Sequence, residues 1–256
     1  MITMLKKELR ELWRSKKTIV TFIILAVLAM TSIIMSKFEP QILNALLEAR
    51  GTELPESFIE YLSTPPGVSQ AAANFFGNIS NIMIWVIILT TATAVNSEYI
   101  NGTYSLYLNT KKSEFVITKF AARIIINFGA ILLAAAFALL YIAVLFESAV
   151  LPGFAQSLII LCVYAAFTTA YSLLFSAVFK TVLKSIGISI LFCIVLQMFS
   201  SFPVIGGYLP GGFAPHISAF LSGANSTGYI AYLVITVALT ALCLVFATIG
   251  IKKYRV

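Results

Sequence analysis

Residues 124–146 read IIINFGAILLAAAFALLYIAVLF, a run without a single charged side chain. A helix needs about 20 mostly apolar residues to cross roughly 30 Å of hydrocarbon, and this run is long enough. Because the run is continuous rather than alternating, and because lipid tolerates no open backbone, it predicts a helix and not a barrel strand. The complete set of predicted spans is Thr18–Ser36, Phe75–Val95, Ile124–Phe146, Leu158–Phe179, Ser185–Phe202 and Tyr229–Ile251. The predicted fold is therefore an all-α membrane protein, with residues 1–256 forming a single transmembrane domain.

The composition agrees with this fold and excludes several kinds of chemistry. Of the 256 residues, 60% are hydrophobic and 11% are charged, whereas a soluble domain carries about 25% charged residues. The sequence has no Asp, one His (His216) and no Gly-Lys dipeptide. A P-loop needs Gly-Lys, and an intramembrane zinc protease needs at least two His. We therefore predict no catalytic residue, no metal site, no cofactor in this chain and no nucleic-acid partner.

The distribution of Lys and Arg predicts the orientation. Of the 17 basic residues, all but Lys37 and Arg50 fall before the first span, in the second-to-third and fourth-to-fifth loops, or after the last span. By the positive-inside rule, both termini are cytoplasmic in a multi-pass protein of the plasma membrane.

Residues 1–17 combine apolar side chains at helical spacing with basic side chains on the other faces. This pattern predicts an interfacial helix lying on anionic lipid, with Trp13 and Arg14 at the membrane interface. The alternative is a basic flank that serves only to set the orientation.

Two segments on the outer side also have distinctive compositions. Residues 37–74 carry five Glu, and Pro40 suits the first turn of a short extracellular helix that Gly51 would end. A solvated loop is the alternative.

Residues 203–228 have no charged residue at all. We interpret them as a re-entrant segment, broken at Gly206–Gly207 and Gly211–Gly212, whose backbone is either buried in protein or lines a cavity. His216 is predicted to be a hydrogen-bonded interfacial residue.

Residues 96–119 form the predicted cytoplasmic segment after the second span. Gly102 and Thr103 break that span, and Thr103 can cap a short helix that ends near Leu108. The helix would show Tyr104 and Leu106 to the cytoplasm. Exposed aromatic and leucine side chains indicate a docking surface for another protein.

These features together resemble the membrane subunit of an ABC-2 type ABC transporter, in particular small bacterial exporters of peptides or antibiotics. The resemblance rests on the basic interfacial helix, the six spans, the Glu-x-x-x-Gly-Thr motif with its short helix, and the re-entrant segment. It implies that the short helix is a coupling helix in a cleft of a separate ATPase, with Glu98, Gly102, Thr103 and Leu106 at the joint. It also implies two ATPase copies that hold ATP and Mg, a second membrane subunit (homodimer or related heterodimer), and export.

The spans offer few polar side chains for a substrate path. Ser189, Cys193, Gln197 and Ser200 recur every three or four residues in the fifth span, either lining the path or bonding between helices. Asn81 and Trp85 share one face of the second span. The candidate path residues are therefore Asn81, Trp85, Ser189, Gln197 and Ser200. Such a path suits amphipathic or apolar cargo.

A stand-alone channel or an ion-driven secondary carrier is the alternative function. Ion-driven carriers usually place ionisable residues inside their spans, where the coupling ion binds. The six predicted spans contain none, which favours energy supplied by a partner.

Overall fold

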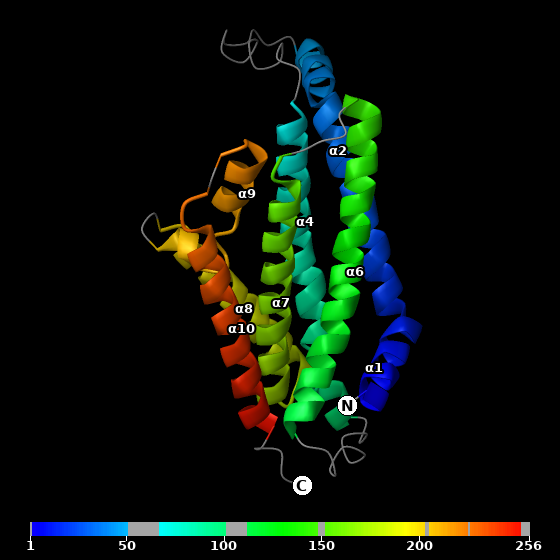
Figure 1. The fold of residues 1–256 in the computed structure, drawn as a ribbon. Helices are drawn as coiled ribbons and strands as arrows, with labels where there is room; N and C mark the ends of the chain where they lie inside the picture. Colours follow the sequence, from blue (N-terminus) through cyan, green and yellow to red (C-terminus); the bar gives the residue numbers. More distant parts are fainter. Residues whose placement is uncertain are drawn as a thin grey trace.

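The computed structural model describes residues 2–50, 67–100, 112–147, 152–202, 205–224 and 226–251. This part of the chain is helical and contains no strand. Six helices are long and apolar enough to cross a membrane, which confirms the predicted six-span, all-α fold. The elements, shown in Figure 1, are α1 (Ile2–Arg14), α2 (Lys16–Arg50), α4 (Val68–Thr91), α5 (Asn96–Ile100), α6 (Lys112–Phe146), α7 (Phe154–Val178), α8 (Val182–Ser200), the 3₁₀ turn η2 (Gly206–Tyr208), α9 (Ala214–Leu221) and α10 (Tyr229–Ile251).

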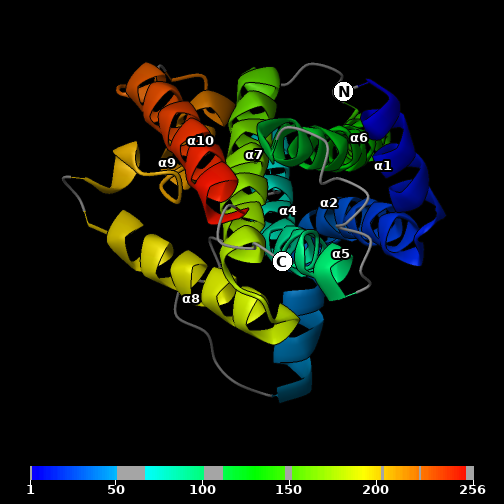
Figure 2. The same ribbon diagram turned by 90° about the horizontal axis from the view of Figure 1, so that it is seen from below.

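Helix α7 is the central element of the bundle. It contacts α4, α6, α8, α9 and α10, and Figure 2 shows it between these neighbours when the bundle is seen from below. By contrast, α8 and α10 are the least buried of the six long helices. Helix α1, the short α5 and the last turn of α10 all lie at the lower end in Figure 1, here called the α1 end. One end of the molecule therefore gathers short helices beside the ends of the long ones.

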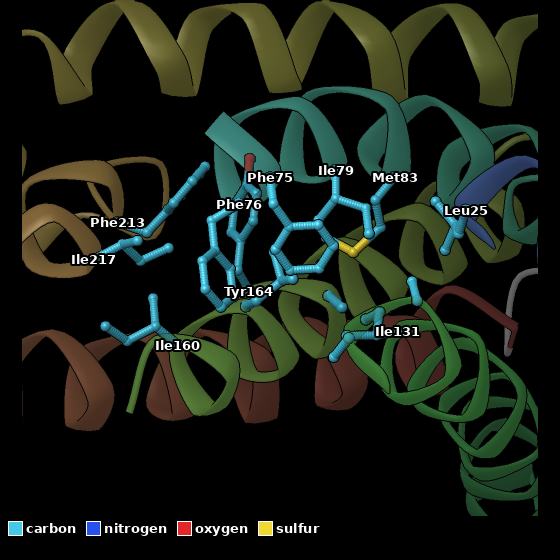
Figure 3. Close-up of a cluster of buried hydrophobic side chains, with 14 of the residues drawn as sticks. Leu25, Phe75, Phe76, Ile79, Met83, Ile131, Ile160, Tyr164, Phe213 and Ile217 are labelled. Atoms are coloured by element: carbon cyan, nitrogen blue, oxygen red, sulfur yellow. The ribbon is translucent and has the colours of Figure 1, made fainter. Parts of the chain in front are cut away.

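The main core lies between α4 and α7. Figure 3 shows Phe75, Ile79 and Met83 of α4 directed toward Tyr164 of α7, and all four side chains are buried. The Tyr164 ring lies 4.6 Å from the ring of Phe213, measured between centroids. Because lipid is as apolar as these side chains, close packing rather than removal from water stabilises such an interface.

Two hydrogen bonds fix the register of α2 against α4. The Asn74 amide donates to the Ser36 hydroxyl at 2.9 Å, and the Asn78 amide donates to the Ser32 hydroxyl at 3.1 Å. The two pairs lie one helical turn apart on each helix. In an apolar interface these polar pairs define which residues stand opposite one another.

The C-terminal part of α2 differs from the prediction. Pro40 does not begin a new helix: α2 runs without interruption from Lys16 to Arg50, with Pro40 inside it. Proline favours a first turn because it has no N–H, but an interior position costs one backbone hydrogen bond, here to the carbonyl of Ser36. The helix-forming residues on both sides of Pro40 outweigh that loss.

The long helices also extend into two segments predicted to lie between spans. Helix α4 begins at Val68, so residues 68–74 belong to it and not to the segment 37–74. Helix α6 begins at Lys112, so residues 112–119 are helical. Hydropathy marks the apolar centre of a span, whereas helical structure continues into its polar flanks.

The segment 203–228 forms a compact unit in its described residues. After α8 the chain makes the turn η2, a second turn through Gly211–Gly212 and the helix α9, which contacts α4 and α7. Phe213, Ile217 and Leu221 are buried in the main core. His216 bonds through Nε2 to the Gly207 carbonyl at 2.7 Å and through Nδ1 to the Ser226 hydroxyl. His216 is thus hydrogen-bonded, as predicted.

We expect Gly212→Ala to destabilise the protein markedly. A Cβ atom at residue 212 would lie 1.8 Å from the carbonyl oxygen of Gly206, and backbone cannot yield as a flexible side chain can. Gly77→Ala is the matched control, because a Cβ there has no neighbour within 4 Å and alanine favours a helix over glycine by about 1 kcal/mol. Thermal unfolding in detergent should show a lower midpoint for Gly212→Ala only. Equal midpoints for the two variants would contradict the close approach.

Candidate functional site

A buried ammonium group joins three helices at the α1 end. Lys119 of α6 donates from Nζ to Oε1 of Glu8 in α1 at 2.7 Å and to Oε1 of Glu98 in α5 at 2.9 Å. The Lys119 side chain is 2% exposed, and Nζ also lies 5.0 Å from the centroid of the Phe115 ring. Burial of a charged group costs several kcal/mol of lost hydration, so the group needs close partners of opposite charge. The two carboxylates supply them, and each comes from a different helix.

Arg123, one turn further along α6, balances the charge of this cluster. It is buried and interacts electrostatically with Glu8 and Glu98, so two buried carboxylates face two buried cations. The exposed carboxylate of Glu11, which pairs with Lys7, also lies within 4.8 Å of those of Glu8 and Glu98. The Nε and Nη1 atoms of Arg123 have no hydrogen-bond partner among the described residues. Arg123 lines a cavity of about 30 Å³, together with Ser15, Thr18 and Asn127. The cluster is thus neutral overall but polar on its inner side.

The turn that leads into α5 is anchored to the central helix as well. The Val95 N–H donates to the Ser176 hydroxyl of α7 at 2.9 Å. The Asn96 amide donates to the Ser185 hydroxyl of α8 at 2.8 Å, and that hydroxyl donates in turn to the Phe175 carbonyl at 3.0 Å. All the linking side chains are buried. Helix α5 is therefore connected by polar contacts to α1, α6, α7 and α8.

A second hydrophobic cluster surrounds this junction. It brings together side chains from the start of α5, from α6 and α7 and from the end of α10, namely Ala94, Val95, Phe115, Val116, Leu173, Ala177, Ala247 and Ile251. The α1 end thus has a small core of its own, beside the charged cluster.

The predicted docking residues are divided between described and undescribed parts of the chain. Glu98 lies in α5, where it is buried in the ion pair with Lys119. Gly102, Thr103 and Leu106 lie outside the described residues. The assignment of these four residues to an ATPase joint stays a prediction. The structure shows that α5, which precedes Gly102, Thr103 and Leu106 in the chain, is held by the contacts of Glu98 and Asn96.

The candidate path residues of α8 differ in burial. Ser189 is fully buried and its hydroxyl donates to the Ser185 carbonyl at 2.7 Å. Gln197 is exposed on the helix surface, and its side chain interacts with the buried Tyr164 hydroxyl. Ser200 is half-buried and donates to the Leu196 carbonyl at 2.8 Å. Within this chain, Ser189 faces the bundle, whereas Gln197 lies at its rim.

The other candidate residues are exposed. Asn81 and Trp85 lie on one exposed face of α4, as their spacing predicted. Trp13 and Arg14 are exposed at the end of α1, and the Trp13 ring packs edge-on against Phe22 of α2 at 6.2 Å between centroids. All four side chains are available to groups outside this chain.

Sequence reasoning missed Glu8, Lys119 and Arg123. Lys119 and Arg123 were counted as loop charges, although they are four residues apart on one face of α6. A signal for Glu8 was present: together with Leu5 and Leu12 it recurs at the i, i+3, i+7 spacing of a buried helix face. An acidic residue on the apolar face of a basic helix indicates a buried cation opposite it.

The chain matches the sequence model of a known protein family. The sequence model of the family described as "ABC-2 family transporter protein" matches residues 2–241. No curated protein matches the chain.

We expect Glu8→Gln to destabilise the protein by about 3 kcal/mol, because removal of one partner from a buried ion pair leaves an uncompensated charge. Glu11→Gln is the comparison on the same helix, because the exposed Glu11 carboxylate lies within 4.8 Å of those of Glu8 and Glu98 but pairs with a different cation. Glu11 pairs with Lys7 at 3.6 Å on the surface, and exposed pairs contribute about 0–1 kcal/mol. The readout is the free energy of unfolding in detergent. A loss no larger for Glu8→Gln than for Glu11→Gln would contradict the role given to the buried cluster.

Proposed function

Because the chain belongs to the ABC-2 family of transporter proteins, we propose that it moves amphipathic or apolar cargo outward with energy from a separate ATPase subunit. Family membership itself makes it a multi-pass membrane subunit of an ABC transporter, one that acts with an ATPase and is not itself the catalytic part. The proposed location is the plasma membrane of a bacterium, with both termini in the cytoplasm.

The ATPase would hold all of the nucleotide chemistry. The chain has no Gly-Lys dipeptide, and therefore no P-loop lysine to reach the β- and γ-phosphates of ATP. ATP and Mg would bind to the partner. Two ATPase copies would dock on two membrane subunits, through residues 96–119 of each.

The observation that supports this coupling is the anchoring of α5. The predicted docking residues follow α5 directly, and α5 is held by Glu98–Lys119, by Asn96–Ser185 and by the Ser176 hydroxyl. A displacement of the docking residues by a closing ATPase dimer would therefore act on α1, α6, α7 and α8 together. Packed helices respond to such a displacement by shifting as rigid bodies.

The path would lie between two membrane subunits, on the surfaces of α4 and α8. Both helices carry exposed polar side chains, Asn81 on α4 and Gln197 on α8, among exposed apolar ones such as Trp85 and Met198. Polar side chains in a span usually face other helices or a cavity rather than lipid. A surface that mixes an amide with large apolar groups suits cargo that is itself amphipathic.

Leu106→Asp tests the docking assignment. A charge in an apolar protein contact costs several kcal/mol of binding free energy unless it finds a partner, so the ATPase should no longer co-purify and ATP turnover in lipid should fall to the level of the free ATPase. Leu183→Asp is the matched control, because Leu183 is an exposed leucine at the start of α8. Retention of the ATPase by Leu106→Asp, or its loss from both variants, would remove the docking assignment.

Gln197→Leu tests the path. Leucine is favourable in lipid and Gln197 is exposed, so the cost to folding should be limited to the lost contact with the Tyr164 hydroxyl, and basal ATP turnover should change little. Transport of a fluorescent amphipathic dye into proteoliposomes that contain the ATPase should change several-fold. Met198→Leu, an exposed apolar exchange at the next residue, is the control. A destabilised Gln197→Leu protein with unchanged transport per folded molecule would mean that Gln197 serves packing alone.

A further inference from the structure

A groove opens between α1, α2 and α6 on the side of α1 that faces away from the Glu8–Lys119 pair. Its volume is about 440 Å³, within the range of roughly 300–1,000 Å³ usual for ligand sites. The side chains that matter for its chemistry are Lys6, Arg10, Trp13, Arg14, Phe22 and Ile125. We call it the α1 groove.

One rim of the α1 groove is cationic. Lys6, Arg10 and Arg14 follow one another at four-residue intervals, so they lie on one face of α1. All three are exposed, and none forms a salt bridge with any residue in the described ranges. Their neighbour Lys7, by comparison, pairs with Glu11. Three adjacent cations without a carboxylate partner form a site for an anion.

The floor of the groove is apolar. Phe22 of α2 lies beneath the edge of Trp13, and Ile125 of α6 is 50% exposed beside it. Phe22 also packs against α6, where a Cβ at residue 129 would lie 3.4 Å from Phe22 Cζ. Phe22 and Ile125 both belong to helices long and apolar enough to cross a membrane, so the floor is continuous with the surface that faces hydrocarbon.

We propose that the α1 groove binds one anionic phospholipid, with its phosphate on Arg10 and Arg14 and the start of an acyl chain on Phe22 and Ile125. The groove has cations at its rim and apolar side chains at its floor. A phospholipid has its anionic headgroup and its acyl chains in the same order. A free anion would use only the rim, and an apolar chain only the floor. This is a discrete site of three helices, distinct from the diffuse attraction of a basic helix to a charged membrane surface.

The test uses the full chain in detergent with added dioleoylphosphatidylglycerol or dioleoylphosphatidylcholine, and native mass spectrometry counts the lipids retained per chain. We expect the wild type to retain one phosphatidylglycerol in preference to phosphatidylcholine. Arg10→Gln should reduce that retention about fivefold, the effect of about 1 kcal/mol for one basic residue near an anionic lipid. Ile125→Trp, which fills the floor without changing charge, should reduce it by a similar factor.

Lys184→Gln is the matched control, since Lys184 is an exposed lysine near the start of α8 that does not line the groove. It should leave retention unchanged. Equal losses for Arg10→Gln and Lys184→Gln would overturn the proposal in favour of diffuse attraction. So would equal retention of the two lipids, or unchanged retention by Arg10→Gln or by Ile125→Trp. A thermal midpoint near that of the wild type establishes that each variant is folded.

Discussion

The ammonium group of Lys119, shared between Glu8 and Glu98, is the interaction on which the α1 end depends. A lysine that is almost fully buried remains charged only if the loss of its hydration is offset by direct contacts. Those contacts come from two helices that are far apart in sequence and have no long apolar interface with each other. The same nitrogen atom therefore links α1 to α5, in addition to the packing of α1 on α2 and α6 and the bonds of Val95 and Asn96 to Ser176 and Ser185.

Next to this junction, the central helix α7 differs from the peripheral helices α8 and α10. Helix α7 contacts five neighbouring helices, and two of its hydroxyl groups, those of Thr168 and Thr169, bond to its own carbonyl groups four residues earlier. Such hydroxyls are satisfied without a partner helix and allow close packing. Helices α8 and α10 are the least buried of the six long helices, and in the proposed assembly their free surfaces would meet lipid, cargo or a second subunit.

The sequence was sufficient for the six spans, because the thickness of the hydrocarbon layer imposes a length that any apolar run must meet. It was not sufficient at their ends, where α2 passes through Pro40 and α6 begins before its apolar run. Nor could it pair Glu8 with Lys119, since hydropathy gives the position of a residue along the membrane normal but not which helix it faces. The spacing of Asn81 and Trp85 correctly placed them on one face of α4, whereas the similar spacing in α8 joined a fully buried Ser189 to an exposed Gln197. Helical spacing shows which residues share one face of a helix, but the burial of each residue on that face depends on the helices packed against it.

The pairing of α2 with α4 has a geometric consequence of its own. Asn74 and Asn78 are four residues apart, as are their partners Ser36 and Ser32. If α2 slid along α4 by one turn, a translation of about 5.4 Å, one asparagine would meet the other serine and one of the two hydrogen bonds would form again. A slide of half a turn would leave both amides facing apolar side chains. Sliding of α2 along α4 would therefore favour positions about one helical turn apart, separated by positions of higher energy in which both asparagine amides lack a partner.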